Sequence, residues 1–518
     1  MNRSMKMHQM IKRSKLSLLG LLGLALFASP TAAQVSDGGP SDPALFDAVI
    51  TVPTGGDLQL FLNVILQTIS GGSSIQLNVP ESADLGDGLF AFSGSEVNIS
   101  GGSLGDRFEA RSGSEVNISG DIIVGDFFDA RGGSEVNISG GMFGDQFLAR
   151  SGSVVNISDG SFGAEFLADS GSEVNFSGGS LPDFSNAAGN LNISGGSVGI
   201  GFDARAGSEV NISGGNVGEN FNANDGSVVN ISGGSVARNL DPKSGSVVNI
   251  SGGNVAGFGA TAGSQVNISG GHVSAFAVGL TGVKAGGEVN ISGGEVDFGL
   301  ARPGGVLNFS GGSLGDRFFA GAGSVVNISG GTIGDEFDAG AGSVVNISGG
   351  TIGDGFEAGS RFGNAGEINI SGGTFGNRFR AFQGMTVNLL GSNFALDGEP
   401  LDSLTIDETF TIVDRNVMLT GLLADGSAFS FDLNSVYVPG TDEDTFSTSA
   451  TLTVTLVAAV GDVLLGDADQ NGVVDFADIP AFIAILQAGM FVPEADINQD
   501  GVVDFDDIPR FIELLQAG

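Results

Sequence analysis

Residues 210–234 read VNISGGNVGENFNANDGSVVNISGG, and this stretch spans one full period of a repeat that runs through the middle of the chain. The tetrad Val-Asn-Ile-Ser that opens it returns 19 residues later. Repetition at a fixed period indicates an architecture in which each unit stacks on its neighbours. The tetrad and its close variants place an Asn at sixteen positions: Asn98, Asn117, Asn137, Asn156, Asn175, Asn192, Asn211, Asn230, Asn249, Asn267, Asn290, Asn308, Asn327, Asn346, Asn369 and Asn388.

Apolar residues flank each of these asparagines, as Val97 and Ile99 flank Asn98. This alternation is the period-2 pattern of a strand with one buried face. A second apolar position lies six residues after the Asn, and Gly-Gly pairs between the two suit tight corners. A Phe commonly lies ten residues after the Asn, as at the nine positions Phe108, Phe147, Phe166, Phe202, Phe221, Phe318, Phe337, Phe356 and Phe379.

One repeat cannot bury its apolar side chains alone, whereas stacked repeats place Val on Val, Ile on Ile and Phe on Phe. The sequence therefore predicts a mainly β chain whose residues 96–390 form a parallel β-solenoid (β-helix) of about sixteen 19-residue coils. Strands in neighbouring coils pair in register in such a fold.

Two polar positions of the repeat allow more than one interpretation. The Asn can form a ladder of amide hydrogen bonds between coils, it belongs to an Asn-Ile-Ser glycosylation sequon, or it can line a ligand-binding face. We favour the ladder, because the repeat explains the Asn without glycans. Acidic residues eight positions after the Asn are either turn caps, which we favour, or a strip that recruits cations; they are Asp106, Asp145, Glu219, Asp316, Asp335 and Asp354.

The segments on either side of the repeat have other patterns. Residues 1–33 combine a basic start, an apolar run at 16–28 and small residues at 31–33, which is typical of a secretory signal peptide. Residues 34–95 should form an N-terminal cap, with the apolar segment 57–69 over the first coil. Residues 391–462 contain short alternating segments and predict a small β-rich cap domain, with strands at 409–413, 429–433 and 452–456.

Composition excludes several function classes. The chain of 518 residues has no Cys and no Trp, one Tyr and two His, of which His8 lies in the predicted signal peptide. A thiolate site is therefore excluded, and a histidine-based site would depend on His272 alone. Removing the five basic residues of the signal peptide takes the formal charge from −39 to −44. Such a chain repels nucleic acid and anionic lipid, and no later segment is apolar enough to span a membrane.

Two loops interrupt the repeat where the spacing between successive tetrad Asn residues widens to 23 residues. The first carries His272 and Lys284, and the second carries Arg361. Loops on a rigid scaffold are common places for binding or catalysis, but these three residues do not define a site.

The last 52 residues contain a duplication. Residues 467–489 (DADQNGVVDFADIPAFIAILQAG) and 496–518 (DINQDGVVDFDDIPRFIELLQAG) agree at 16 of 23 positions. Each starts with oxygen-bearing side chains at positions 1, 3, 5, 9 and 12 of a twelve-residue loop, with Gly at position 6 and a carbonyl ligand at position 7. Ca²⁺ prefers six to eight oxygen ligands, and this spacing wraps them around one point.

The duplication therefore predicts two Ca²⁺ ions, one in each loop. The ligands of the first are Asp467, Asp469, Asn471, the Val473 carbonyl, Asp475 and Asp478. The ligands of the second are Asp496, Asn498, Asp500, the Val502 carbonyl, Asp504 and Asp507.

A helix should follow each loop, with Asp478 or Asp507 as its cap and a Pro in its first turn. Apolar residues at helical spacing predict that the two helices pack on each other through matching stripes. The first stripe is Ile479, Phe482, Ile483 and Leu486, and the second is Ile508, Phe511, Ile512 and Leu515.

Residues 463–518 resemble a type I dockerin, in which two calcium loops are each followed, but not preceded, by a helix. The resemblance covers about a tenth of the chain. It implies a small α-helical domain that folds with calcium and attaches to a cohesin module on a scaffold protein or cell surface, often in polysaccharide degradation. Recognition residues of the family lie at loop positions 10 and 11, which here are Phe476, Ala477, Phe505 and Asp506. Cellulosomal dockerins usually carry Ser or Thr there, so this departure leaves the identity of the partner open.

The Gly-rich array also looks like repeats in secreted bacterial proteins that carry dockerins. We therefore expect a secreted bacterial rod, extracellular or on the cell surface, that docks through its calcium module. An alternative is a polysaccharide lyase or glycoside hydrolase on a β-helix, and a third hypothesis is an adhesin that binds polysaccharide through cations. The near-uniform coils and the single Tyr, Tyr437, argue against an active site.

Overall fold

The structure is a computed structural model, and it describes residues 34–36, 48–51, 75–79, 84–278, 286–359, 365–401, 405–438, 440–457, 465–469, 474–488, 492, 494–497 and 502–517. The predicted signal peptide and the apolar segment 57–69 lie outside these ranges. The chain divides into two compact units, Met1–Phe318 with Gly323–Val325 and Phe319–Ala322 with Val326–Gly518. It is mainly β, with a parallel β-solenoid of about 15 turns and two short helices near the C-terminus.

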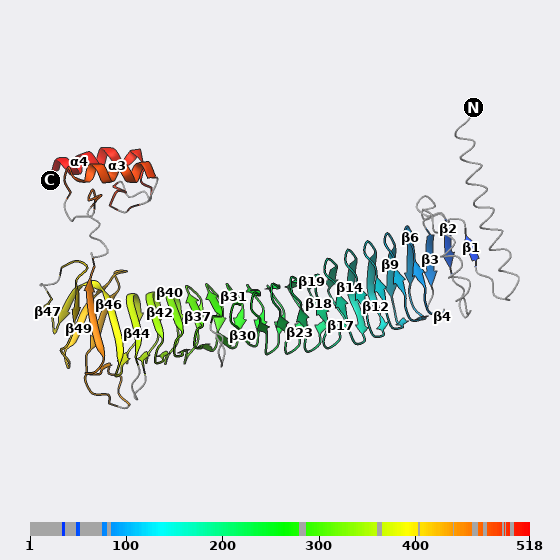
Figure 1. Cartoon of the computed structure of the whole chain (residues 1–518), viewed down its shortest axis with the longest axis horizontal. Coiled ribbons are helices and arrows are strands. Elements are labelled where there is room, and N and C mark those ends of the chain that lie inside the picture. Colours follow the sequence, from blue (N-terminus) through cyan, green and yellow to red (C-terminus); the bar gives the residue numbers. More distant parts are fainter. Residues whose placement is uncertain are drawn as a thin grey trace. The chain divides into compact units, whose positions relative to one another are not determined.

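Each coil of the first unit contains up to three strands, which stack on the equivalent strands of the neighbouring coils (Figure 1). The strands that contain the tetrad are β6 (Ser95–Ile99), β9 (Glu115–Ser119), β12 (Glu135–Phe143), β14 (Val154–Phe162), β16 (Glu173–Phe176), β19 (Asn190–Ile193), β22 (Glu209–Ile212), β25 (Val228–Ile231), β28 (Val247–Ile250), β31 (Gln265–Ile268), β34 (Glu288–Ile291) and β37 (Val306–Phe309). In β12 and β14 the strand continues through the corner, which is Gly-Gly in β12 and Asp159-Gly160 in β14.

In most coils the second strand carries the apolar position six residues after the Asn; after Asn117 an extra residue moves the buried position to Val124, and Ile123 is 59% exposed. These strands are β4 (Asp84–Leu85), β7 (Ser103–Leu104), β10 (Ile123–Val124), β17 (Ser180–Leu181), β20 (Ser197–Val198), β23 (Asn216–Val217), β26 (Ser235–Val236), β29 (Asn254–Val255), β32 (His272–Val273), β35 (Glu295–Val296) and β38 (Ser313–Leu314).

The third strand follows the buried Phe position. These strands are β5 (Phe90–Ala91), β8 (Glu109–Ala110), β11 (Asp129–Ala130), β13 (Leu148–Ala149), β15 (Leu167–Ala168), β18 (Asn186–Ala187), β21 (Asp203–Ala204), β24 (Asn222–Ala223), β27 (Asp241–Pro242), β30 (Phe258–Ala260), β33 (Phe276–Val278) and β36 (Gly299–Ala301). The first nine strands of this list, from β5 to β27, form one parallel sheet.

Pairing between coils is in register, as the repeat predicts. In β22 and β25, Val210 pairs with Val229 and Asn211 with Asn230. The side chains that point inward form a continuous core: all nine predicted Phe side chains are at most 2% exposed. Phe128, Phe147 and Phe166 stack face to face on successive coils, with ring centroids 4.9 and 5.3 Å apart. Aromatic stacking therefore adds to the aliphatic core along the coil axis.

The Asn ladder is confirmed. In the first unit the Nδ2 of each tetrad Asn donates to the Oδ1 of the Asn one coil before it, at 2.7 to 2.9 Å, from Asn117 through to Asn308. The same bonds link Asn346, Asn369 and Asn388 in the second unit. There the hydroxyl of Thr453 donates to the Oδ1 of Asn388 at 2.7 Å and so caps the last acceptor.

The acidic position eight residues after the Asn caps turns, as favoured above. The Oδ1 of Asp106 accepts the amide of Asp126 on the next coil at 2.9 Å, and the Oδ1 of Asp145 accepts that of Ala164 at 2.7 Å. The residue that follows the acidic position often has a left-handed backbone conformation although it is not glycine. Its φ is 62° at Arg107 and 66° at Glu165. The sequence pattern did not reveal these left-handed corners.

The Gly-Gly pair is required by close approach between coils. A Cβ on Gly214 would meet the carbonyl oxygen of Ser194, and Gly215 has φ +75°. Glycine alone meets both demands at low cost. Each coil therefore approaches its neighbour through backbone at this corner.

The sheet starts earlier than the repeat does. Strand β3 (Ile75–Val79) pairs in parallel with β6 and aligns Asn78 with Asn98. Strand β2 (Ala48–Thr51) pairs with β3 in parallel, and β1 (Gln34–Ser36) pairs with β2 antiparallel.

The second unit continues the same coil design and then changes it. Its strands are β39 (Phe319–Ala320), β40 (Val325–Ile333), β41 (Asp338–Ala339), β42 (Val344–Ile352), β43 (Glu357–Ala358), β44 (Gly366–Phe375), β45 (Arg380–Ala381), β46 (Met385–Leu396), β47 (Glu399–Pro400), β48 (Thr409–Thr411), β49 (Met418–Leu423), β50 (Ala428–Asp432), β51 (Thr445–Phe446) and β52 (Thr451–Leu456). The helical elements are α3 (Asp478–Ala488), the 3₁₀ turn η2 (Phe505–Asp507) and α4 (Ile508–Ala517).

The strands expected in the region 391–462 are present, as β48, β50 and β52. They do not stand apart from the solenoid sheet, because β52 pairs with β46 in parallel and aligns Thr453 with Asn388. Strand β48 covers the other side of β52 in antiparallel pairing. The dipeptide Asp425-Gly426 is a hairpin signal in the sequence, and it lies in the turn between β49 and β50, which pair antiparallel. The sequence did not indicate the strand β49 itself, which also pairs with the extension of β46.

We predict that Asn211→Ala lowers the midpoint of chemical denaturation, by the equivalent of about 1–3 kcal/mol, because it leaves an amide donor and an acceptor of two neighbouring coils without their partner. The control is Asn216→Ala, which removes an exposed asparagine of β23 and should change stability by less than about 0.5 kcal/mol. Equal effects of the two substitutions would contradict a stabilising ladder.

A second prediction concerns Asp338 in β41. Burial and then the charge of Glu357, its partner on β43, raise the pKa of this carboxyl from 3.8 to about 6. Because the folded-state pKa lies above the unfolded value, stability is greatest when Asp338 is protonated and falls as the pH rises from about 4 to about 6.

Asp338→Asn should therefore raise the denaturation midpoint at pH 7.5, by an amount of order 1 kcal/mol, and have a much smaller effect at pH 4. The control is Glu399→Gln in the exposed strand β47. Equal effects of Asp338→Asn at the two pH values would contradict the raised pKa.

Candidate metal centre

Three carboxylates converge in the first C-terminal loop. One oxygen each of Asp467, Asp469 and Asp478 lies within 4.8 Å of the other two. Asp467 is 5% exposed and Asp478 is fully buried, whereas Asp469 is exposed. These residues are positions 1, 3 and 12 of the predicted calcium loop, so the fold brings the two ends of the loop together.

The Asp478 side chain fixes the shape of the first loop. Its Oδ1 accepts the amide of Asp469 at 3.0 Å, and its Oδ2 accepts the amide of Asp475 at 2.9 Å. The Oδ1 of Asp475 in turn accepts the amide of Ala477 at 2.6 Å. One buried carboxylate therefore ties the start and the end of the loop to the first residue of α3.

The second loop repeats this arrangement. Asp507 is fully buried, and its carboxylate accepts the amides of Ile497 at 2.8 Å and Asp504 at 2.9 Å. Asp496, at position 1, is 6% exposed. Asp504 is the N-cap of η2 and accepts the amide of Asp506 at 2.8 Å, and Asp507 completes a capping box by accepting the amide of Asp504.

The remaining predicted ligands are placed in part. Asp475 and Asp504, at position 9, are exposed, and the Val502 side chain is 54% exposed. Four predicted ligands lie outside the described residues, namely Asn471, Val473, Asn498 and Asp500.

The helices that follow the loops pack against each other. The rings of Phe482 and Phe511 stack with centroids 4.1 Å apart. They belong to a cluster with Ala468, Ala495, Ile497, Val503 and Leu515, flanked by Ile479, Leu486 and Ile508. The apolar contact between two equivalent helices is therefore as expected.

Two residues of the predicted stripes do not take part. Ile483 is 46% exposed and Ile512 is 47% exposed; Ile485 and Leu514 pack on the cluster instead. The cause is Asp478, which is buried and lies one turn before Phe482 on the same face of α3. Because the Asp478 side chain must face inward to bond the loop amides, the centre of the buried face of α3 is shifted away from the centre of its apolar stripe. Asp507 acts in the same way on Ile512.

Convergent carboxylates are unfavourable without a counter-charge. Two like charges 4 Å apart repel by about 4 kcal/mol at an effective dielectric constant of about 20. Backbone amides satisfy some of the oxygens of Asp478 and Asp507. A hard divalent cation would remove the repulsion, and an all-oxygen ligand set of this kind suits Ca²⁺. The described residues therefore fit the calcium hypothesis.

The predicted partner-binding residues lie on the surface of the same segment. Phe476 is 71% exposed and Phe505 is 77% exposed, at position 10 of their loops. Ala477 and Asp506 are also exposed. Large exposed aromatic side chains at equivalent places in two loops are unusual in a small domain and typical of an interaction surface.

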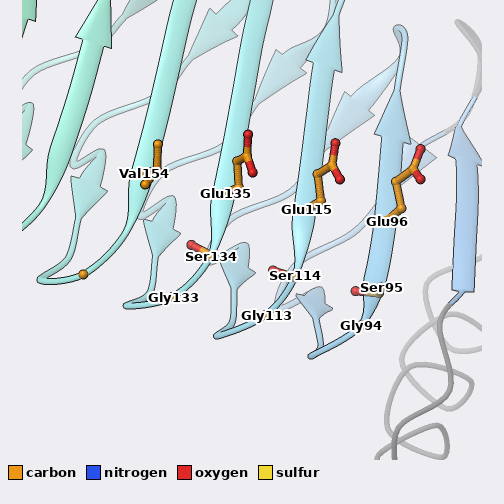
Figure 2. Close-up of a pocket in the computed structure, with 11 residues that line it drawn as sticks. Gly94, Ser95, Glu96, Gly113, Ser114, Glu115, Gly133, Ser134, Glu135 and Val154 are labelled. Atoms are coloured by element: carbon orange, nitrogen blue, oxygen red, sulfur yellow. The ribbon is translucent and has the colours of Figure 1, made fainter.

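The solenoid offers a groove of a different kind. Figure 2 shows Glu96, Glu115 and Glu135 in a row on β6, β9 and β12, at the edge of a groove of about 450 Å³. The amides of Asn98 and Asn117 donate to Glu96 at 2.8 Å and to Glu115 at 3.3 Å. The row therefore belongs to the Asn ladder, and its groove is lined by glycine, serine, glutamate and one valine, Val154.

The residues of the two interrupting loops are only partly placed. His272 lies in β32, whereas Lys284 and Arg361 fall outside the described residues. Among the residues that the structure describes, no helix is long and apolar enough to traverse a bilayer. Comparison of the chain with protein-family models, with curated proteins and with solved structures finds no match.

We predict that the full chain takes up two Ca²⁺ ions in isothermal titration calorimetry at about 0.15 M NaCl, where weak binding to surface charge is screened. Asp478→Asn and Asp507→Asn should each abolish one of the two binding events or weaken it by at least about tenfold, because each removes a carboxylate ligand at position 12 of its loop.

The matched control is Asp506→Asn, which removes an exposed carboxylate at position 11 and should leave both events unchanged. Two events that persist in the double variant Asp478→Asn/Asp507→Asn would show that calcium binds elsewhere.

Proposed function

We propose that this protein is a secreted, non-enzymatic β-solenoid that a calcium-dependent, dockerin-type module at 463–518 attaches to a cohesin-like protein or to a scaffold on the bacterial cell surface. The observation that carries the proposal is the convergence of Asp467, Asp469 and Asp478 to within 4.8 Å. The second loop supports it, because Asp507 is also buried and also accepts one amide from the start of its loop and that of position 9. A tandem arrangement of this kind has a specific use in calcium binding.

Calcium would act on the module through its loops. Each loop packs against the shared cluster through residues next to the carboxylates, such as Ala468 and Ile497. An ion that holds a loop closed therefore also holds the two helices together, so metal binding and folding are coupled.

The docking face would include both exposed loop residues, Phe476 and Phe505, and the exposed helix residues Ile483 and Ile512. In the duplication, Phe476 corresponds to Phe505 and Ile483 corresponds to Ile512. A partner with an apolar surface would bury them, and the acidic surroundings would favour basic residues at its rim. The departure from Ser and Thr at positions 10 and 11 fits a partner that differs from cellulosomal cohesins.

The solenoid would serve as a stiff spacer in this proposal. The two recurring polar positions of its repeat are used within the fold, with Asn bonded to Asn and the capping Asp carboxylates bonded to backbone amides. The groove along β6, β9 and β12 has no aromatic residue for sugar stacking. We therefore place the function at the C-terminal module.

The experiment compares binding of the full chain to isolated cell-envelope proteins in Ca²⁺ and in chelator. We expect saturable binding in Ca²⁺ that chelator abolishes, and a loss of at least about tenfold in the double variant Phe476→Asp/Phe505→Asp, since burial of two aromatic side chains is removed.

The control is calcium uptake by the same double variant, which should stay at two ions. Binding that survives chelator, or that the double variant leaves unchanged, would contradict docking through this face.

A further inference from the structure

A cluster on the solenoid combines the one histidine of the repeat region with two carboxylates. One ligand atom each of His272, Glu295 and Asp297 lies within 4.8 Å of the others. The Nε2 of His272 and the Oδ1 of Asp297 are 3.0 Å apart. All three residues belong to the first unit and lie far in sequence from the C-terminal loops.

The register of the solenoid creates this cluster. His272 on β32 pairs directly with Glu295 on β35. Asp297 is two residues further on, so it points to the same side as Glu295. The valines between them, Val273 and Val296, point into the core and are at most 1% exposed. The three polar side chains are thus presented together on the outer face of two adjacent coils.

The backbone holds the three positions firmly. The amide of Glu295 donates to the carbonyl of Gly271 at 2.9 Å, and that of Asp297 donates to the carbonyl of Val273 at 3.0 Å. Side chains on paired strands of a sheet are positioned more precisely than side chains on loops.

The repeat itself singles out these residues. The position five after the tetrad Asn is Ser, Thr or Asn in most copies, and it carries an imidazole or a charge only at His272 and Glu295. The position seven after the Asn is Gly in most copies and is charged only at Asp297. All three departures therefore fall in two consecutive coils and meet at one point, which scattered surface variation would not produce.

We propose that His272, Glu295 and Asp297 form a binding site for a divalent transition-metal ion, with Zn²⁺ as the representative. One imidazole nitrogen with two carboxylate oxygens is a ligand set for such ions, whereas Ca²⁺ and Mg²⁺ take oxygen ligands. Tetrahedral bonds of about 2.0–2.1 Å place ligand atoms roughly 3.4 Å apart, a spacing that these side chains reach by small rotations. His272 is 36% and Asp297 50% exposed, so a fourth position faces solvent and can take water or an oxygen ligand.

The test is a Zn²⁺ titration of the full chain, purified without a polyhistidine tag and kept in excess Ca²⁺ so that the C-terminal loops are occupied. We expect one Zn²⁺ per chain by calorimetry, and a tetrahedral absorption spectrum when Co²⁺ replaces it. His272→Gln and Asp297→Asn should each weaken the binding by at least about tenfold, because each removes one of three ligands.

One control separates this site from general charge effects. Glu209→Gln removes a carboxylate from β22 and should not alter Zn²⁺ affinity. Circular dichroism checks that the variants keep the β fold. Absence of Zn²⁺ uptake in excess Ca²⁺, or wild-type affinity in either His272→Gln or Asp297→Asn, would overturn the proposal and leave a simple histidine–carboxylate contact.

Discussion

In-register stacking of one coil on the next is the constraint on which this structure depends. Parallel pairing at about 4.8 Å places each residue beside its equivalent in the neighbouring coil, as Asn211 lies beside Asn230. Residues that interact favourably with a copy of themselves therefore stabilise the stack. Asn does so through its amide, and Phe does so by stacking. The constraint also explains why glycine recurs at the corner, where backbone meets backbone.

In-register stacking is costly for charge, and three arrangements of carboxylates show how differently the chain places them. Along the corner of the solenoid, residues such as Asp106 accept a backbone amide of the next coil. Beside the ladder, Glu96 accepts the amide of Asn98. In the C-terminal loops, Asp467, Asp469 and Asp478 converge, and this third arrangement is the one that we propose needs a cation. The acidic composition of the chain is thus distributed over structurally different positions, and only some of them point to function.

The period-2 pattern around each Asn and the recurring Phe predicted the coil, its buried face and the ladder, because these features repeat and each copy tests the others. Features that depend on tertiary contacts could not be predicted in this way. The strand that completes the stack, β52, lacks the tetrad and is joined to β46 by pairing. Strand β3 aligns Asn78 with Asn98 but is not followed by the Gly-Gly pair that marks the repeat. In the C-terminal segment, spacing predicted the two helices and the approach of Asp467, Asp469 and Asp478. The burial of Asp478 and the exposure of Ile483 depend on tertiary packing, which periodicity alone cannot show. The His272 cluster required the register between coils, although its departures from the repeat were visible in the sequence.

Hydrogen–deuterium exchange of the full chain in Ca²⁺ and in chelator tests most directly whether a cation organises the C-terminal segment while internal bonds organise the solenoid. The account predicts that chelator strongly increases exchange in peptides from 465–488 and 494–517 and leaves exchange in 84–278 unchanged. Unchanged protection of the C-terminal peptides in chelator, or loss of protection along the solenoid, would contradict it.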